Sequence, residues 1–334
     1  MITPDPDIAG PHFLGIGAQK AGTTWLHKNF SHHPGIWLPY EKELHYFDEK
    51  LDRLRSMEEV IRSRAAWAVR WRRQVERQLG NHGRDPSSTD LVWCARFFVS
   101  QPDDDWYLSL FTPGPGQIAG EFTPEYAVID TDRIARVATV NPELRVIYMV
   151  RNPIERVWSH ASMTGRVTSD AAIDTGWFAR AVARNRVREH TAYLANLDRW
   201  SSVFPPDRIY LGFLEDISFH PKRLLASLYR FLGLEPEAYD RVITRKVHAG
   251  GATTIPTVLA VRLAEEYHGA LEALSARLGG YASVWLSIAD ELLRRPPSAP
   301  EIPYPFWESD LAAAAGYRPA TGEAAGPQSG PLGT

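Results

Sequence analysis

The sequence predicts an α/β protein with three layers, α/β/α, around a central, mainly parallel sheet of about five strands. Five short apolar runs alternate with segments of helical pattern, and they lie at residues 12–17, 35–38, 117–122, 144–151 and 208–214. This alternation is typical of right-handed βαβ units whose parallel strands are covered by helices on both faces. The length of 334 residues is sufficient for one large core.

A glycine-rich turn follows the first apolar run, and it makes the predicted fold P-loop-like. The turn has the sequence Gly-Ala-Gln-Lys-Ala-Gly-Thr-Thr-Trp, residues 17–25, and opens directly into a helical pattern. N–H groups at a helix start have no intrahelical partner and lie at the positive end of the helix dipole, so they can bind an anion. In the Walker pattern a lysine follows the second glycine, whereas here Thr23 follows Gly22 and Lys20 lies inside the loop. This argues against a metal-dependent ATPase or GTPase and favours another phosphate-ester donor, although a purely structural turn fits equally well.

A second polar segment follows the apolar run at 144–150, with Arg151 at its start and Ser159 in the next helical pattern. The turn and this segment together resemble the donor-binding motifs of sulfotransferases that use 3′-phosphoadenosine 5′-phosphosulfate. The resemblance implies that Arg151 and Ser159 hold the 3′-phosphate, with adenosine 3′,5′-bisphosphate as the product. It also implies that the donor is held by Gln19, Lys20, Ala21, Gly22, Thr23, Thr24 and Trp25. The alternatives are that Arg151 only caps the sheet edge and that Trp25 is a core residue that does not stack on adenine.

The polar segment after the second run, residues 39–48, is the expected catalytic segment. It contains Glu43-Leu44-His45-Tyr46-Phe47-Asp48, which resembles the E-x-H-[FY]-F-D segment of heparan-sulfate-type sulfotransferases. The resemblance implies that Glu43 is the general base, with His45 and Asp48 beside it, and that Lys20 stabilises the leaving phosphate without a metal. Glu41 is a competitor for the role of base, and a polar loop with inward-packed aromatic residues is the structural alternative.

Weaker matches extend the resemblance along the chain. Residues 106–107 and 120–126 resemble family segments, but Phe122 replaces a lysine of the eukaryotic pattern, and Leu214 replaces a tyrosine of the cytosolic branch. The catalytic histidine motif of that branch is not visible. Lys246 and His248 lie in a basic, glycine-containing turn where the family closes a loop over the nucleotide, so they are expected to contact the donor. A surface turn is an equally good interpretation of these two residues.

The chain is expected to form one domain, residues 1–316. A helical insertion is expected at about 50–100, and a mostly helical part from about 235 includes residues 257–278 and 282–294. Residues 317–334, rich in glycine, alanine and proline, are expected to be a disordered tail. Residues 50–79 combine eight arginines with Trp67 and Trp71, a pattern that predicts either a lid that recognises the acceptor or a solvated helix.

Composition limits the possible partners and compartment. The formal net charge of −3 gives no overall positive field for nucleic acid, and the single cysteine, Cys94, excludes an internal disulfide. No stretch is long and uncharged enough to span a bilayer. We therefore expect a cytoplasmic enzyme of the soluble bacterial type that acts on a small-molecule or glycan acceptor of unknown identity. A P-loop small-molecule kinase and a non-catalytic nucleotide-binding module are the alternatives.

Overall fold

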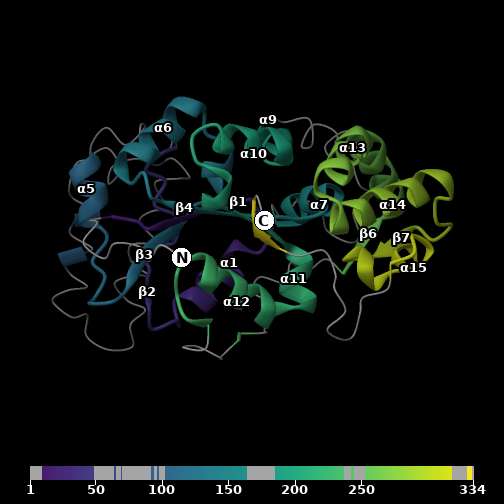
Figure 1. The fold of residues 1–334 in the computed structure, drawn as a ribbon. Helices are drawn as coiled ribbons and strands as arrows, with labels where there is room; N and C mark the ends of the chain where they lie inside the picture. The colour runs from purple at the N-terminus through teal and green to yellow at the C-terminus, as the bar shows by residue number, and fades with distance from the viewer. Residues whose placement is uncertain are drawn as a thin grey trace.

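A six-stranded sheet forms the centre of the molecule, with strand order β2-β3-β1-β4-β5-β8 (Figure 1). The computed structural model describes residues 10–48, 64, 69, 92–93, 96–97, 102–163, 185–236, 242–243, 253–317 and 329–332. The five mutually parallel strands are β1 (Phe13–Gly17), β2 (Ile36–Trp37), β3 (Ile118–Phe122), β4 (Arg145–Val150) and β5 (Ile209–Phe213). These strands coincide with the five apolar runs, which confirms the predicted fold class.

Helices cover both faces of this sheet. On one face lie α6 (Thr131–Val140), α9 (Asn185–Glu189) and α10 (Tyr193–Ser201) (Figure 1). On the other lie α1 (Thr23–Phe30), α11 (Leu214–Phe219) and α12 (Pro221–Phe231). Strands β1 and β4 are almost entirely buried because they lie between these two layers, which explains why they appear in the sequence as continuous apolar runs.

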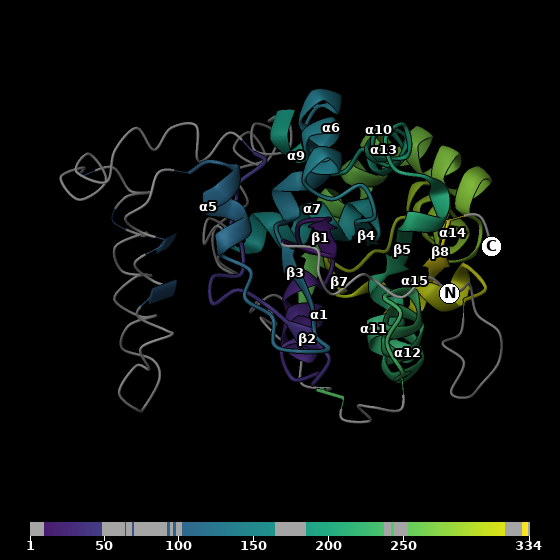
Figure 2. The same ribbon diagram turned by 60° about the vertical axis from the view of Figure 1, so that its left-hand side comes forward.

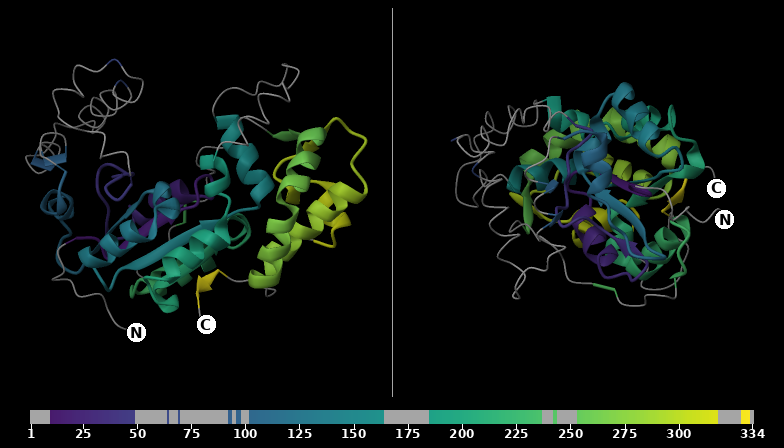
Figure 3. Two further views of the ribbon diagram at one scale, coloured as in Figure 1. Left: turned by 90° about the horizontal axis from the view of Figure 1, so that it is seen from above. Right: turned by 90° about the vertical axis from the view of Figure 1, so that its left-hand side faces the viewer.

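The C-terminal part of the chain forms a helical unit at one end of the sheet (Figures 1 and 3). It consists of β6 (Thr254–Pro256), α13 (Thr257–Leu278), α14 (Gly280–Arg294), β7 (Glu301–Pro303), the 3-10 helix η5 (Phe306–Glu308) and α15 (Asp310–Ala314). Strands β6 and β7 form their own antiparallel pair. The unit contacts the sheet layer through α13, which packs against α7 (Pro153–Met163).

At the opposite end, the short helix α5 (Asp104–Ser109) packs beside the loop after β2 (Figure 2). Its N-cap Asp103 accepts a hydrogen bond from the N–H of Trp106, and Trp106 and Tyr107 are buried. Aromatic rings hold α5 against this loop, including Tyr107, which stacks on Tyr46 with ring centroids 4.4 Å apart.

The expectation of a wholly disordered tail over 317–334 is wrong for residues 329–332. These residues add β8 (Gly330–Pro331) to the sheet, antiparallel to β5. The N–H of Leu332 donates to the carbonyl of Ile209 (2.8 Å), and the N–H of Ser329 donates to Asp216 Oδ2 (3.2 Å). The physical reason is that β5 would otherwise expose unpaired backbone groups, a long-range effect that tail composition does not reveal.

Other predictions fall outside the described residues. Almost all of the insertion at 50–100 does so, including its arginine-rich part, as do Lys246 and His248. Among the helices that are described, none is long and apolar enough to cross a bilayer.

Candidate active site

The expected site residues meet at the carboxyl edge of the parallel strands. The glycine-rich loop follows β1, the Glu43 segment follows β2, Glu121 lies near the end of β3, and Arg151 follows β4 directly. Because β2, β3, β1 and β4 are successive neighbours in the sheet, their ends form one continuous edge. Ligands of open α/β sheets bind at this edge.

The loop between β1 and α1 has the backbone of an anion-binding turn. Gly22, the N-cap of α1, has a φ of 94°, a conformation that strains any residue with a Cβ, and a Cβ there would also displace the Cδ1 atom of Ile217, 2.3 Å away. Its carbonyl accepts from the N–H groups of Trp25 and Leu26 (2.9 and 3.1 Å). The N–H groups of the first helical residues, Thr23 and Thr24, have no intrahelical acceptor and can bind an anion.

Two cations, Lys20 and Arg151, are brought together by this loop. The guanidinium Nη1 of Arg151 donates to the backbone carbonyl of Lys20 (3.3 Å). Burial, followed by the like charge of Arg151, lowers the pKa of Lys20. Its ammonium group lies 3.5 Å from Met163 Sδ, and within the described part of the chain no carboxylate pairs with it. Two neighbouring cations with little neutralising charge on Lys20 form a favourable place for a polyanion.

Arg151 is held rigidly, and Ser159 shares a partner with it. Arg151 is 7% exposed and lies 3.4 Å from the carboxylate of Glu155, one turn further along α7. Its Nη2 also donates to the hydroxyl of Tyr304 (2.5 Å), and the side chain of Ser159 is near enough to this hydroxyl to affect the pKa of Tyr304. The structure thus brings the side chains of Arg151 and Ser159 near the same phenol hydroxyl, and their binding of a 3′-phosphate stays a prediction. The structure adds Tyr304, for which the sequence offers no motif.

The Glu43 segment forms a carboxylate–histidine–carboxylate chain. Asp48 Oδ2 lies 2.5 Å from Nδ1 of His45, and Nε2 of His45 lies 3.4 Å from Glu43 Oε2. The buried Asp48 therefore orients the imidazole toward Glu43. The side chain of Glu43 is 38% exposed, whereas the competing Glu41 is buried, with only 8% of its surface exposed. Glu43 is thus the carboxylate that an acceptor can reach.

Lys42 is a functional candidate that the sequence analysis missed. Its ammonium group lies 3.1 Å from Glu43 Oε1. Burial would raise the pKa of Glu43, but the hydrogen bond from His45 and the charge of Lys42 outweigh it and lower this pKa to about 2. Glu43 is therefore ionised at neutral pH, as a proton acceptor must be. The sequence signal for this pairing is that Lys42 directly precedes Glu43.

The buried carboxylate of Glu121 holds the Glu43 segment in place through hydrogen bonds. It accepts hydrogen bonds from the hydroxyls of Tyr107 (2.6 Å), Thr123 (2.7 Å) and Tyr126 (3.1 Å), and from the N–H of Leu44 (3.3 Å). Burial raises the pKa of Glu121 despite these bonds. The bond to Leu44 fixes the backbone next to Glu43.

Backbone strain coincides with the expected catalytic residues. In the described part of the chain, Lys20 (φ 72°) and His45 (φ 58°) are the non-glycine residues with positive φ. Such conformations persist where the surrounding structure imposes them, commonly at functional sites. This coincidence is independent of the sequence motifs.

Two positions lie in the core: Phe122, which replaces a lysine of the eukaryotic pattern, and Trp25, for which the sequence allows either adenine stacking or a core role. Phe122 is fully buried and packs edge-to-face on Phe13, Phe30 and His27. Trp25 is 5% exposed, and its Nε1 donates to the carbonyl of Ile243 (2.6 Å).

The described residues contain no group of three or more metal-ligating side chains placed to hold an ion.

The fold and the site together define an α/β protein that carries a glycine-rich loop at the carboxyl edge of its sheet. A profile described as the sulfotransferase family matches residues 11–238, and the chain belongs to this family.

Among curated proteins, human heparan sulfate glucosamine 3-O-sulfotransferase 6 is 28% identical over 155 residues, which cover 42% of this chain and 41% of that protein. Human bifunctional heparan sulfate N-deacetylase/N-sulfotransferase 2 is 22% identical over 244 residues, 68% of this chain and 22% of that protein. The chain thus spans less than half the length of these relatives. Among solved structures, a sulfotransferase from Alicyclobacillus acidocaldarius aligns with a TM-score of 0.54 at 21% identity, covering 80% of this chain and 96% of that chain, which shows a shared fold.

Proposed function

We propose that this protein transfers a sulfuryl group from 3′-phosphoadenosine 5′-phosphosulfate to a hydroxyl or amine of a small-molecule or glycan acceptor. The observation that carries the proposal is the convergence of Lys20 and Arg151 at the loop between β1 and α1. Two neighbouring cations, one of which lowers the pKa of the other, are stabilised by a ligand with several negative charges. A doubly phosphorylated nucleotide meets this requirement.

The residues present fit such a donor. The N–H groups of Thr23 and Thr24 and the ammonium of Lys20 would hold the 5′-phosphosulfate, and Arg151 with Ser159 would hold the 3′-phosphate. When bound, the donor supplies a sulfuryl group whose bond to the phosphate oxygen breaks as a new bond to the acceptor oxygen or nitrogen forms. Lys20 would stabilise the charge that develops on the phosphate.

Glu43 would take the proton of the acceptor. Its carboxylate is ionised, partly exposed, and oriented by the His45–Asp48 pair. Lys42 pairs with the same carboxylate, so the charge attraction of this pair is lost when Glu43 receives the proton.

Nucleotide binding tests the class of donor. Isothermal titration should show that adenosine 3′,5′-bisphosphate binds more tightly than adenosine 5′-phosphate, and that Lys20→Ala weakens binding. Lys28→Ala is the matched control, because Lys28 is exposed on α1 away from the loop. Equal affinity for the two nucleotides, or binding of ATP with Mg²⁺ but of neither of these nucleotides, would point instead to the kinase alternative.

Acceptor identity requires a transfer assay. A mass-spectrometric screen of phenols, glycans and amines with the sulfate donor should reveal a product heavier by one sulfuryl group. Glu43→Gln should abolish turnover while nucleotide affinity stays unchanged, because Glu43 faces the acceptor. Full activity of Glu43→Gln would exclude Glu43 as the base.

A further inference from the structure

Tyr304 brings a side chain from the C-terminal unit to the residues proposed to hold the 3′-phosphate. Its hydroxyl lies 2.5 Å from Nη2 of Arg151, and the side chain of Ser159 is near enough to it to affect the pKa of Tyr304. The guanidinium carbon of Arg151 also lies 5.1 Å from the centroid of the Tyr304 ring. One side chain therefore contacts both residues of the expected phosphate site.

The position of Tyr304 is fixed by backbone contacts on both sides. Its N–H donates to the carbonyl of Thr253 (2.9 Å), which extends the β6–β7 pair by one bond. Two residues further on, the N–H of Phe306 donates to Glu155 Oε1 (2.5 Å). Glu155 also pairs with Arg151, so the same carboxylate holds both the arginine and the segment that carries Tyr304.

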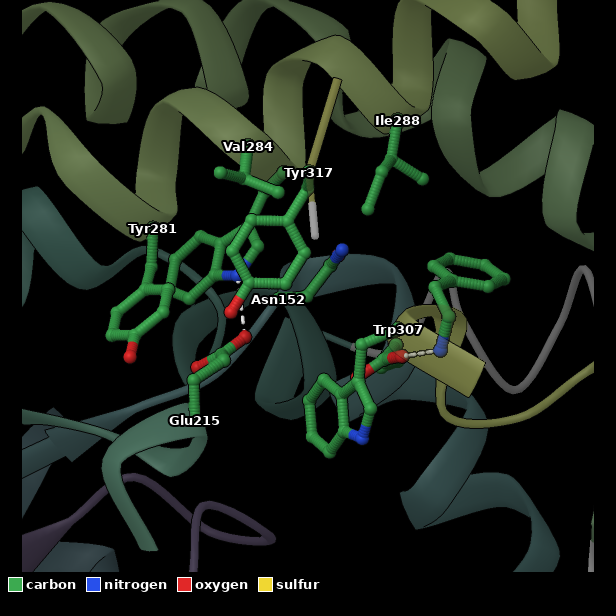
Figure 4. A pocket seen from close by; sticks show the side chains of 10 residues that line it. Asn152, Glu215, Tyr281, Val284, Ile288, Trp307 and Tyr317 are labelled. Carbon is green, nitrogen blue, oxygen red and sulfur yellow. Dashed lines mark hydrogen bonds between the residues drawn. The ribbon is translucent and has the colours of Figure 1, made fainter. Parts of the chain in front are cut away.

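Packing of the C-terminal unit against the sheet edge supports this arrangement (Figure 4). A pocket at their junction is lined by Asn152, Glu155 and Glu215 from the sheet side and by aromatic residues from the C-terminal unit, Tyr281, Trp285, Phe306, Trp307 and Tyr317 among them. Nε1 of Trp285 donates to Glu215 Oε1 (2.6 Å) across it. Tyr304 thus enters the site from a unit that lies beyond the family match at 11–238.

Hydrogen-bond chemistry indicates what the hydroxyl can do there. A guanidinium only donates, so in its contact with Arg151 the phenol oxygen is the acceptor, and its own proton is available to another group. Burial raises the pKa of Tyr304, so the hydroxyl keeps this proton at neutral pH. The guanidinium of Arg151 and the phenol proton of Tyr304 therefore lie side by side as two kinds of donor.

We propose that Tyr304 is a donor-binding residue that completes the 3′-phosphate site and gives preference to nucleotides carrying that phosphate. The inference rests on the proposed function, because it assumes that Arg151 and Ser159 face the 3′-phosphate. On binding, the hydroxyl of Tyr304 donates its proton to the 3′-phosphate while its oxygen still accepts from Arg151.

Tyr304→Phe tests the proposal, because it removes one hydroxyl and keeps the ring against Arg151. Isothermal titration should show affinity for adenosine 3′,5′-bisphosphate weakened about 10-fold, the loss typical of a hydrogen bond to a charged group. Affinity for adenosine 5′-phosphate should stay unchanged. Tyr317→Phe is the matched control, since it removes a phenol hydroxyl from the same unit at a residue that lines the pocket, and both affinities should stay as in the wild type.

Three results would overturn the proposal and leave the proposed function standing. Equal effects of Tyr304→Phe on both nucleotides, or no effect on either, would mean that Tyr304 is structural. Tighter binding of the bisphosphate would mean that the hydroxyl competes with the phosphate. A wild-type protein that binds both nucleotides equally would instead refute the proposed function, and this inference with it.

A measurement on the wild-type protein covers the case in which Tyr304→Phe does not fold. Nitration of tyrosines by tetranitromethane can be located by peptide mass spectrometry. Adenosine 3′,5′-bisphosphate should protect Tyr304 from nitration, and adenosine 5′-phosphate at the same saturation should not. Equal protection by the two nucleotides would contradict a contact with the 3′-phosphate.

Discussion

Glu215 should make the stability of this protein depend on pH in a way that a single substitution removes. The residue is 3% exposed near the start of α11, and its Oε1 accepts from Trp285 across the junction with the C-terminal unit. Within the described part of the chain, its Oε2 has no hydrogen-bond partner. Burial, together with the nearby charge of Glu155, raises the pKa of Glu215 to about 8.

The sign and size of the effect follow from linkage. In the unfolded chain a glutamate has a pKa of about 4.3, so between roughly pH 4.5 and 8 the folded protein binds a proton that the unfolded chain does not. The contribution of Glu215 to stability is complete below that window and is lost as the pH rises through it. The slope is about 1.4 kcal/mol per pH unit, or at most about 4 kcal/mol between pH 5 and 8.

The perturbation is Glu215→Gln, which keeps the acceptor for Trp285 and removes the titration. Urea unfolding followed by tryptophan fluorescence at pH 5, 6, 7 and 8 gives the free energy of unfolding of both proteins. The variant should gain stability relative to the wild type as the pH rises, whereas Glu272→Gln, at an exposed position of α13, should not. A difference between wild type and Glu215→Gln that stays constant over these pH values would refute the reasoning.

Three further predictions concern the site itself. The hydrogen bond from His45 and the charge of Lys42 together lower the pKa of Glu43 to about 2, and Lys42→Met removes the second of these causes. Because only the ionised base is active, the acid limb of kcat/KM should move to higher pH, and an unmoved limb would contradict the pairing. Glu121→Ala leaves several donors without an acceptor, including the N–H of Leu44. It should lower the free energy of unfolding, measured with urea, by about 3–5 kcal/mol. A loss below about 1 kcal/mol would count against the hydrogen-bond network around Glu121. Gly22→Ala forces alanine to a φ of 94° and should abolish binding of adenosine 3′,5′-bisphosphate in a titration. The control Gly269→Ala, whose added Cβ meets open space, should leave binding intact. Retained binding in Gly22→Ala would show that the loop geometry is not required.

Much of the fold could be predicted from local sequence patterns. The apolar runs located all five parallel strands to within about two residues, and the pattern at 257–278 coincides with α13, while α14 begins at Gly280, two residues before the predicted start. Backbone geometry and burial on both faces impose such local patterns. The sequence also predicts where the candidate site lies, because Lys20, Arg151 and the Glu43 segment each come in the connection after a strand, and parallel topology brings strand ends together.

Other features depended on contacts between residues far apart in the chain. Tyr304 lies in a proline-rich connection with no motif of its own, and it reaches Arg151 because the β6–β7 pair and Glu155 hold it there. Strand β8 exists because β5 has an unpaired edge. By itself the sequence determined the strands, the anion-binding loop and the candidate base, because these follow from local periodicity and from groups at strand ends. Only the tertiary structure decided which distant side chains complete the site, because such contacts depend on how separate elements pack and leave no periodic trace in the chain.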